Sequence, residues 1–189
     1  MMLNVCLQTI AFVLVFGNCY SQAIRCNDAE LMNIGKFKNL YSISSKIFRS
    51  EQPVSEDWNI LAKEGVTTVI NLRHGDTDAK TVKDTALRYI HLPMKAYDLD
   101  YNKVVECLKI IKDSKGTCLI HCLHGSDRTG CVIACCRIVF CGWSKQKAID
   151  EFLDERFGYH QFWFPGIKKF LEEIDVEKLK NDVYSETGK

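Results

Sequence analysis

The segment His121–Gly130, HCLHGSDRTG, constrains the fold of this chain more than any other segment, because it joins two apolar runs of different length. The run that leads into it, residues 117–121, is short and apolar, as in a buried β-strand. The run that follows, residues 128–141, is apolar on nearly all sides, which for a helix indicates burial against several neighbours. A buried strand, a glycine-containing loop and a central buried helix, in this order, predict a layered α/β fold.

Further elements are predicted on both sides of this segment from short runs rich in β-branched residues and from apolar residues at helical spacing. The predicted strands are 46–51, 66–73, 88–94 and 117–121. The predicted helices run from a cap at Ser55 to Gly65, over 101–112, over 128–141, from a cap at Ser144 to residue 157, and over 162–176. Because strands and helices alternate, we expect a sheet with helices on its faces.

The chain divides into three parts by composition. These are a signal peptide or hydrophobic segment at 1–23, a single domain at 30–176, and a polar C-terminal tail at 177–189. The apolar run 5–16 has the length of a signal-peptide core, and Ser21 and Ala23 provide the small residues of a cleavage site. We predict an exported protein, periplasmic or secreted, if this segment is cleaved, and a membrane-anchored one otherwise.

Charge and cysteine content exclude several classes of partner and site. The formal net charge is +1, so the chain has no overall basic field and no nucleic-acid partner is expected. The cysteines after residue 23 could form a disulfide framework, but most lie in apolar runs, which favours buried thiols. They are Cys26, Cys107, Cys118, Cys122, Cys131, Cys135, Cys136 and Cys141. No C-x-x-C pair is present, so we expect no structural metal. We expect no organic cofactor either.

The loop between the buried strand and the buried helix has the composition of an anion-binding site. Backbone N–H groups of successive residues can point into a concavity at the helix N-terminus, where the helix dipole also favours negative charge. These residues are Leu123, His124, Gly125, Ser126, Asp127 and Arg128. Gly125 allows a close approach that a side chain would obstruct, and the guanidinium of Arg128 can donate two hydrogen bonds to a phosphoryl group.

Cys122 lies where the strand enters this loop. The positive end of the helix favours its thiolate, which could attack phosphorus and form a cysteinyl-phosphate intermediate. We expect His121 to tune the loop through hydrogen bonds. The hydroxyl of Thr129 is placed to donate to the sulfur as it leaves in the second step. Nucleophile, anion cradle and arginine therefore occur in one short stretch.

These residues form the pattern H-C-x5-R-T, and in this the sequence resembles the cysteine-dependent protein tyrosine phosphatase superfamily, especially its compact dual-specificity branch and similar small bacterial proteins. The segments KIFRSEQP, VINLR and GWSKQKAIDEF, at 46–53, 69–73 and 142–152, also resemble that branch. Over residues 40–175 the resemblance implies a single, mostly parallel sheet of four to five strands flanked by helices. The phosphate loop would connect the last strand to the central helix.

The resemblance also implies an aspartic acid that protonates the leaving oxygen, on the loop after the third strand. That loop, KAYDLDY, offers Asp98 and Asp100, neither of them in a W-P-D tripeptide. Asp127 is a further candidate, because myotubularin-like lipid phosphatases carry an aspartate just before the arginine. We rank Asp98 first, Asp127 second and Asp100 third. The structural alternatives are solvated carboxylates, a helix cap at Asp100 and an outward salt bridge at Asp127.

The leading functional hypothesis is a monomeric phosphomonoester hydrolase that acts through Cys122 and takes phosphotyrosine-containing proteins as its default substrate. An inositol phosphate or phosphoinositide is the second candidate, because the short chain leaves little room for peptide-recognition segments. A non-catalytic phosphate-binding module belongs to another class and is disfavoured, because both Cys122 and Arg128 are present. His124 is expected at the rim of the pocket. Arg49 and Arg73 are expected to be structural charges of the surface.

Overall fold

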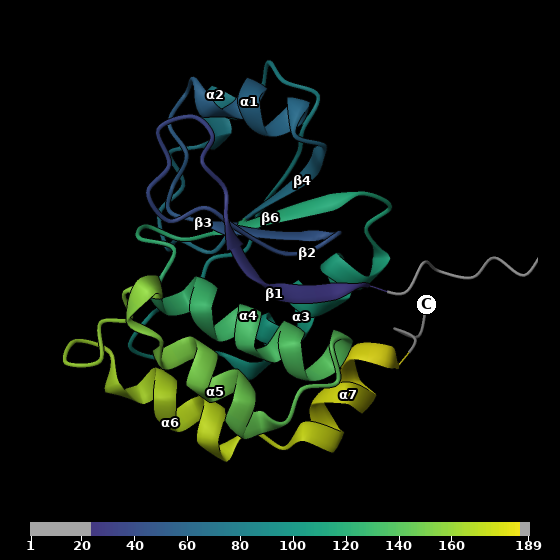
Figure 1. The fold of residues 1–189 in the computed structure, drawn as a ribbon, viewed down its shortest axis with the longest axis vertical. Helices are drawn as coiled ribbons and strands as arrows, with labels where there is room; N and C mark the ends of the chain where they lie inside the picture. Colours follow the sequence, from purple (N-terminus) through teal and green to yellow (C-terminus); the bar gives the residue numbers. More distant parts are fainter. Residues whose placement is uncertain (1–23, 186–189) are drawn as a thin grey trace, which may run out of the picture.

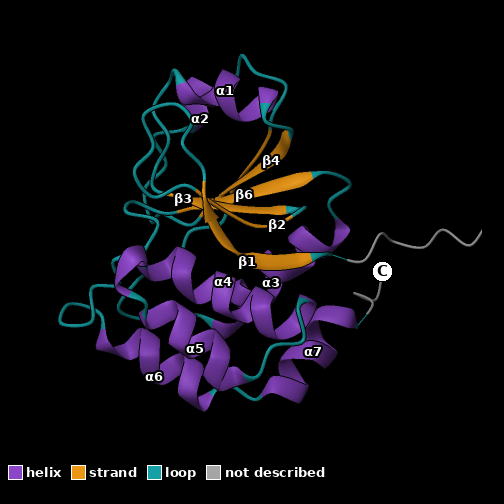
Figure 2. Ribbon diagram, in the orientation of Figure 1, coloured by secondary structure: helices purple, strands orange, loops and turns teal. Residues whose placement is uncertain are grey.

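The computed structural model describes residues 24–185, which form one six-stranded sheet with helices on both faces (Figures 1 and 2). The strand order is β1-β2-β3-β6-β4-β5. The bounds are β1 Cys26–Leu31, β2 Tyr41–Ser44, β3 Ile47–Ser50, β4 Val66–Asn71, β5 Arg88–His91 and β6 Thr117–His121. Strands β3, β6, β4 and β5 pair in parallel, whereas β1 and β2 add an antiparallel edge. The mostly parallel α/β sheet is confirmed.

The two faces of the sheet are covered unequally. In Figures 1 and 2, two short helices lie above the sheet, α1 Asp57–Lys63 and α2 Ala79–Val82. Below it lie α3 Tyr101–Asp113, α4 Asp127–Phe140, α5 Lys145–Leu153, α6 Pro165–Glu173 and α7 Val176–Tyr184. A 3₁₀ turn, Glu155–Phe157, follows α5. The larger hydrophobic core lies on the side of α4, and a smaller one surrounds Trp58 and Leu61 of α1.

Helix α4 is the centre of the larger core. It packs against α3, α5, α6 and α7 as well as against strands β3 and β6. Its residues from Thr129 to Val139 are all buried, which the apolar character of 128–141 predicted. Its N-terminus is therefore held rigidly at the carboxyl end of β6, where the loop of interest lies.

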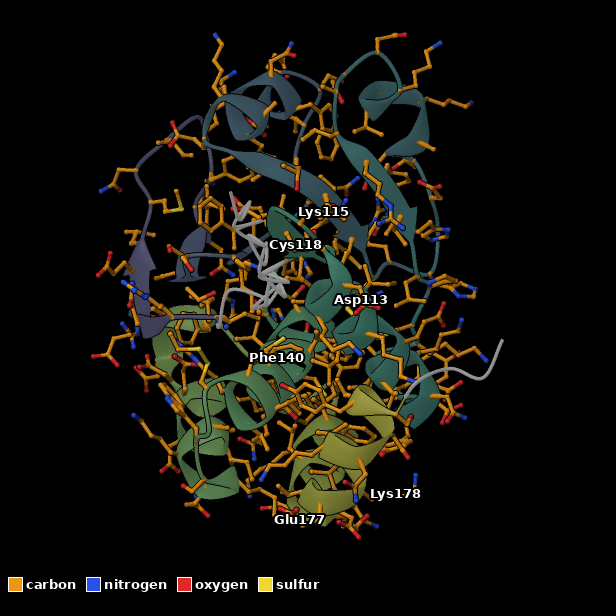
Figure 3. The ribbon with its side chains drawn as sticks, turned by 90° about the vertical axis from the view of Figure 1, so that its right-hand side faces the viewer. Asp113, Lys115, Cys118, Phe140, Glu177 and Lys178 are labelled. Carbon is orange, nitrogen blue, oxygen red and sulfur yellow. A yellow bond between two sulfur atoms is a disulfide. The ribbon has the colours of Figure 1, made fainter. Side chains whose placement is uncertain are left out.

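Three predictions about the elements were wrong. The sheet has six strands rather than four or five, because β1 and β2 pair at the edge although β1 is mostly polar and exposed. Ser55 does not cap α1; the Asp57 carboxylate accepts a hydrogen bond from the backbone N–H of Val54 instead. The region 177–189 does not begin as a polar tail. Residues 176–184 form α7, which buries Leu179 and Val183 and exposes Glu177 and Lys178 (Figure 3).

Two contacts join the edge strands to the helices. The guanidinium of Arg137, fully buried on α4, donates to Glu151 of α5 and to the backbone oxygens of Asn27 and Ile43. A disulfide between Cys26 and Cys141 connects β1 to the residue after α4. The remaining cysteines after residue 23 are free and buried, so the expectation of mostly buried thiols is confirmed, with this pair as the exception.

Residues 1–23, with the predicted signal peptide, lie outside the described residues. Within 24–185, no helix combines the length and apolar character needed to cross a membrane.

Candidate active site

The predicted phosphate loop lies at the carboxyl end of β6, between two parallel neighbours, and runs directly into α4. Cys122 is fully buried at its start. In an open parallel sheet, ligands bind beyond the carboxyl ends of the central strands, where loops from several strands converge. The fold therefore places the loop at the position where an α/β sheet commonly holds a ligand.

Three successive carbonyl oxygens of this loop, those of residues 123–125, accept hydrogen bonds from groups outside it. The backbone N–H of Gln52 donates to Leu123 O at 3.1 Å, and the side-chain amide of Asn39 donates to His124 O at 2.8 Å. Arg49 Nη2 donates to Gly125 O at 2.7 Å. Because a trans peptide places its N–H opposite its C=O, outward carbonyls turn the next N–H groups inward. The loop is thus built as a concave cradle of donors, the arrangement predicted for binding an anion.

Gly125 is the residue at which the cradle touches the sheet. Its φ is +72°, in the left-handed region. A Cβ here would lie 2.5 Å from the carbonyl carbon and oxygen of Ser50, at the end of β3. Both the backbone conformation and the close approach require glycine, as the sequence indicated.

Arg49 was expected on the surface, but it lies in the interior, where it donates a hydrogen bond to the cradle. Its side chain is buried and its guanidinium stacks on the Phe157 ring at 4.2 Å. Burial lowers the pKa of Arg49 to about 10, so it keeps its charge at neutral pH. It thus adds a fixed positive charge beneath Gly125. Arg73, which was also expected to be structural, donates a hydrogen bond to Thr77 at 2.8 Å.

Arg128 and Thr129 present polar atoms that have no partner among the described residues. Arg128 Nη1 reaches Met94 O at 3.4 Å, while its Nε is buried and unpaired. The hydroxyl of Thr129 is buried and also unpaired. Buried donors are normally satisfied, so unpaired ones beside an anion cradle indicate groups kept for a ligand or for the thiolate of Cys122.

His121 is fully buried directly before the nucleophile. Its Nδ1 lies 3.2 Å from Cys122 O, and its Nε2 lies 3.5 Å from the buried carboxylate of Asp78. Burial lowers the pKa of His121 to about 4, against the opposing effect of Asp78, so the ring is neutral near pH 7. The predicted hydrogen bond from His121 to the loop is present. Sequence reasoning missed Asp78, because nothing in its local pattern marks it.

The three candidate acids have different surroundings. Asp98 is exposed on the loop after Met94, and its side chain has no partner among residues 24–185. Asp100 caps α3 by accepting a hydrogen bond from Asn102 N at 2.8 Å. Asp127 is buried, and its carboxylate accepts the backbone N–H of His160 at 3.0 Å.

The ring of His160 completes this contact, with Nδ1 3.1 Å and 3.0 Å from the two Asp127 carboxylate oxygens. The sequence did not identify His160 as the partner of Asp127. His124 is exposed at the rim, as expected, with its ring centroid 5.0 Å from that of His160. One histidine of the loop and one from residues 158–164 therefore flank the buried carboxylate.

Comparison with known proteins relates this chain to phosphatases. A model of the tyrosine phosphatase family matches residues 36–187. The dual specificity protein phosphatase TpbA of Pseudomonas aeruginosa is 34% identical over 122 residues, which cover 64% of this chain and 56% of that protein. The inositol diphosphatase DSP5 of Arabidopsis thaliana is 26% identical over 156 residues, covering 78% of this chain and 74% of that protein. This chain thus spans only about half the length of TpbA.

Solved structures show the same fold. A crystal structure of TpbA in complex with pTyr has a TM-score of 0.74 and 28% identity, covering 84% of this chain and 96% of the other. The catalytic domain of the phosphatase SIW14 of Saccharomyces cerevisiae has a TM-score of 0.64 and 22% identity, covering 78% of this chain and 92% of the other. The latter likeness concerns the fold alone.

Proposed function

Because the chain belongs to the tyrosine phosphatase family, we propose that it hydrolyses phosphomonoesters through a cysteinyl-phosphate intermediate on Cys122. The observation that carries this proposal is the cradle: the carbonyl oxygens of residues 123–125 are bonded to groups outside the loop, with Cys122 at one end and Arg128 at the other. Inward N–H groups and a guanidinium stabilise the negative charge of a phosphoryl group as it is transferred.

The reaction proceeds in two displacements. In the first, the Cys122 thiolate attacks phosphorus, an S–P bond forms, and the ester P–O bond breaks as its oxygen takes a proton from an aspartic acid. In the second, water attacks phosphorus and gives its proton to the same aspartate, now a carboxylate, and the S–P bond breaks to release inorganic phosphate. The free hydroxyl of Thr129 donates to the departing sulfur. No metal or organic cofactor takes part in either step.

Among the three candidate aspartates, Asp98 is the one that we propose as the general acid, because its side chain is not engaged by other residues in the described part of the chain. The carboxylates of Asp127 and Asp100 are engaged by His160 and by the start of α3. Asp98 lies four residues after Met94, whose carbonyl oxygen contacts Arg128, so its loop borders the cradle. An exposed side chain on such a loop can reach a leaving oxygen when substrate is bound.

The substrate that we propose is a protein carrying phosphotyrosine. Large exposed apolar side chains lie on the phosphate loop and on the two loops that contact Arg128 or Asp127: Leu123, Tyr97, Phe162 and Trp163. An aromatic phosphate ester and its flanking peptide can bury this apolar surface, whereas a highly charged inositol phosphate cannot. The structure of TpbA with pTyr supports the same choice. Because this chain is also similar to inositol diphosphatases, inositol phosphates remain the second candidate substrate and are included in the substrate panel below.

A substitution and a substrate panel test this proposal. Cys122→Ser should abolish the hydrolysis of 4-nitrophenyl phosphate while the protein stays folded; hydrolysis that survives would refute the cysteine mechanism. Among substrates, phosphotyrosine peptides should give a higher kcat/KM than inositol phosphates and diphosphates. A preference for an inositol diphosphate would overturn the proposed substrate and leave the mechanism intact.

Export of the protein is part of the proposal. The predicted signal segment supports it, and so does the disulfide between Cys26 and Cys141, because disulfides persist mainly in oxidising compartments. Mass spectrometry of the protein recovered from its native host should find an N-terminus near residue 24 and the Cys26–Cys141 peptide pair. An intact residue 1 with both thiols free would contradict export.

A further inference from the structure

Three potential metal ligands meet beside the phosphate cradle but outside it. The cluster consists of His124 on the loop, Asp127 at the start of α4 and His160 on the segment after the 3₁₀ turn. Their ligand atoms all lie within 4.8 Å of one another. The proposed reaction uses none of these three side chains, so their assembly calls for a separate explanation.

The buried carboxylate is the strongest element of the cluster. The side chain of Asp127 is only 3% exposed, although carboxylates are rarely buried unless they are paired or bind a metal. Its contacts to side chains among the described residues are those with the His160 ring. That ring is 38% exposed, so the carboxylate is reached from solvent through the histidine.

The spacing of the cluster suits a small divalent cation. Nitrogen and oxygen ligands lie about 2.0–2.2 Å from zinc, so neighbouring ligand atoms of a tetrahedral site are about 3.3–3.6 Å apart. His160 Nδ1 lies 3.0 Å from Asp127 Oδ2, so these two atoms need to separate by only a few tenths of an ångström to share an ion. His124 is exposed, and a nitrogen of its ring lies within 4.8 Å of the other two ligand atoms, so it can provide the third ligand.

We propose that His124, Asp127 and His160 form a binding site for a divalent transition metal, with Zn²⁺ the best-suited ion. Two imidazoles and one carboxylate are ligands that zinc uses where it keeps a fourth position open for water or an anion. The ion replaces the proton between His160 and Asp127. It joins the phosphate loop to the segment 158–164. The site does not depend on the proposed hydrolysis, because none of its ligands takes part in that reaction.

Calorimetric titration of Zn²⁺ into the purified Cys122→Ser variant tests the site without the reactive thiol. We expect one ion bound per chain. His124→Gln and His160→Gln should each weaken binding by about 100-fold, since loss of even an outer partner of a metal ligand reduces affinity 10–100-fold. His74→Gln is the matched control: His74 is an exposed histidine on another loop, and its substitution should leave binding unchanged.

Absorption spectroscopy with Co²⁺ identifies the ligand atoms. Nitrogen and oxygen ligation gives visible d–d bands without a thiolate charge-transfer band, and that is the expected spectrum. A thiolate band would assign the metal to a cysteine and overturn the proposal. So would the absence of stoichiometric Zn²⁺ binding, or binding that His124→Gln leaves unaltered. Because His124 is exposed, this last variant decides the question even if substitutions at Asp127 impair folding.

Discussion

Replacing Gly125 by alanine should damage both stability and catalysis, for two separable reasons. The first is the backbone, because φ at this position is +72° and a left-handed conformation costs an L-residue about 1–2 kcal/mol. The second is contact, since the added Cβ would lie 2.5 Å from Ser50 O and 2.6 Å from Glu51 N. These are backbone atoms of a paired strand and cannot turn aside, so overpacking adds about 1–3 kcal/mol. The free energy of unfolding should fall by about 2–5 kcal/mol.

Gly142 provides a matched control. Its φ is +66°, but a Cβ added there would meet no atom within 4 Å. Gly142→Ala therefore carries the backbone cost alone, about 1–2 kcal/mol. The difference between the two variants, measured by denaturant unfolding, isolates the contact between the phosphate loop and β3.

Catalysis provides the second readout. A shift of about 1 Å in the loop displaces the inward N–H groups, and misplacement on that scale reduces rates by about 100-fold. The kcat/KM of Gly125→Ala on an aryl phosphate should fall accordingly, while Gly142→Ala should retain the wild-type value. The reasoning is refuted if Gly125→Ala unfolds no more easily than Gly142→Ala and keeps its activity.

Three further predictions follow from named contacts. Asp98→Asn should lower kcat by about 100-fold for phenyl phosphate but far less for a substrate with an acidic leaving group, and equal losses on both would exclude Asp98 as the acid. Arg137→Met should reduce the free energy of unfolding by about 3–5 kcal/mol, because the Glu151 side chain, which is only 8% exposed, loses its partner; adding Glu151→Leu should recover most of this loss in denaturant titrations. His121 faces Asp78, and burial lowers the pKa of its ring to about 4. Between about pH 6.5 and pH 4, this histidine is therefore protonated in the unfolded chain but neutral in the folded one. Stability should fall by up to about 3 kcal/mol as the pH drops through this window, and His121→Asn should flatten that slope; an unchanged slope would contradict the assignment.

Most of the parallel core of the sheet could be predicted from the sequence. Its strands are short runs rich in β-branched residues, and α4 is apolar on all sides, so their burial can be predicted from local composition. The edge strand β1 and the last helix α7 were missed because their local composition does not indicate burial. Each is mostly polar and packs only a few apolar side chains, such as Leu179, onto a surface that other elements provide.

The identity of the phosphate-loop residues could be determined from the sequence alone, because nucleophile, cradle and arginine occupy one contiguous segment. The tertiary structure decided what surrounds it: Arg49 beneath Gly125, Asp78 against His121, and His160 on Asp127. Each of these partners is separated from the loop by more than thirty residues. The orientation and protonation of a buried polar group depend on the groups brought against it from distant parts of the chain, and only folding brings them there.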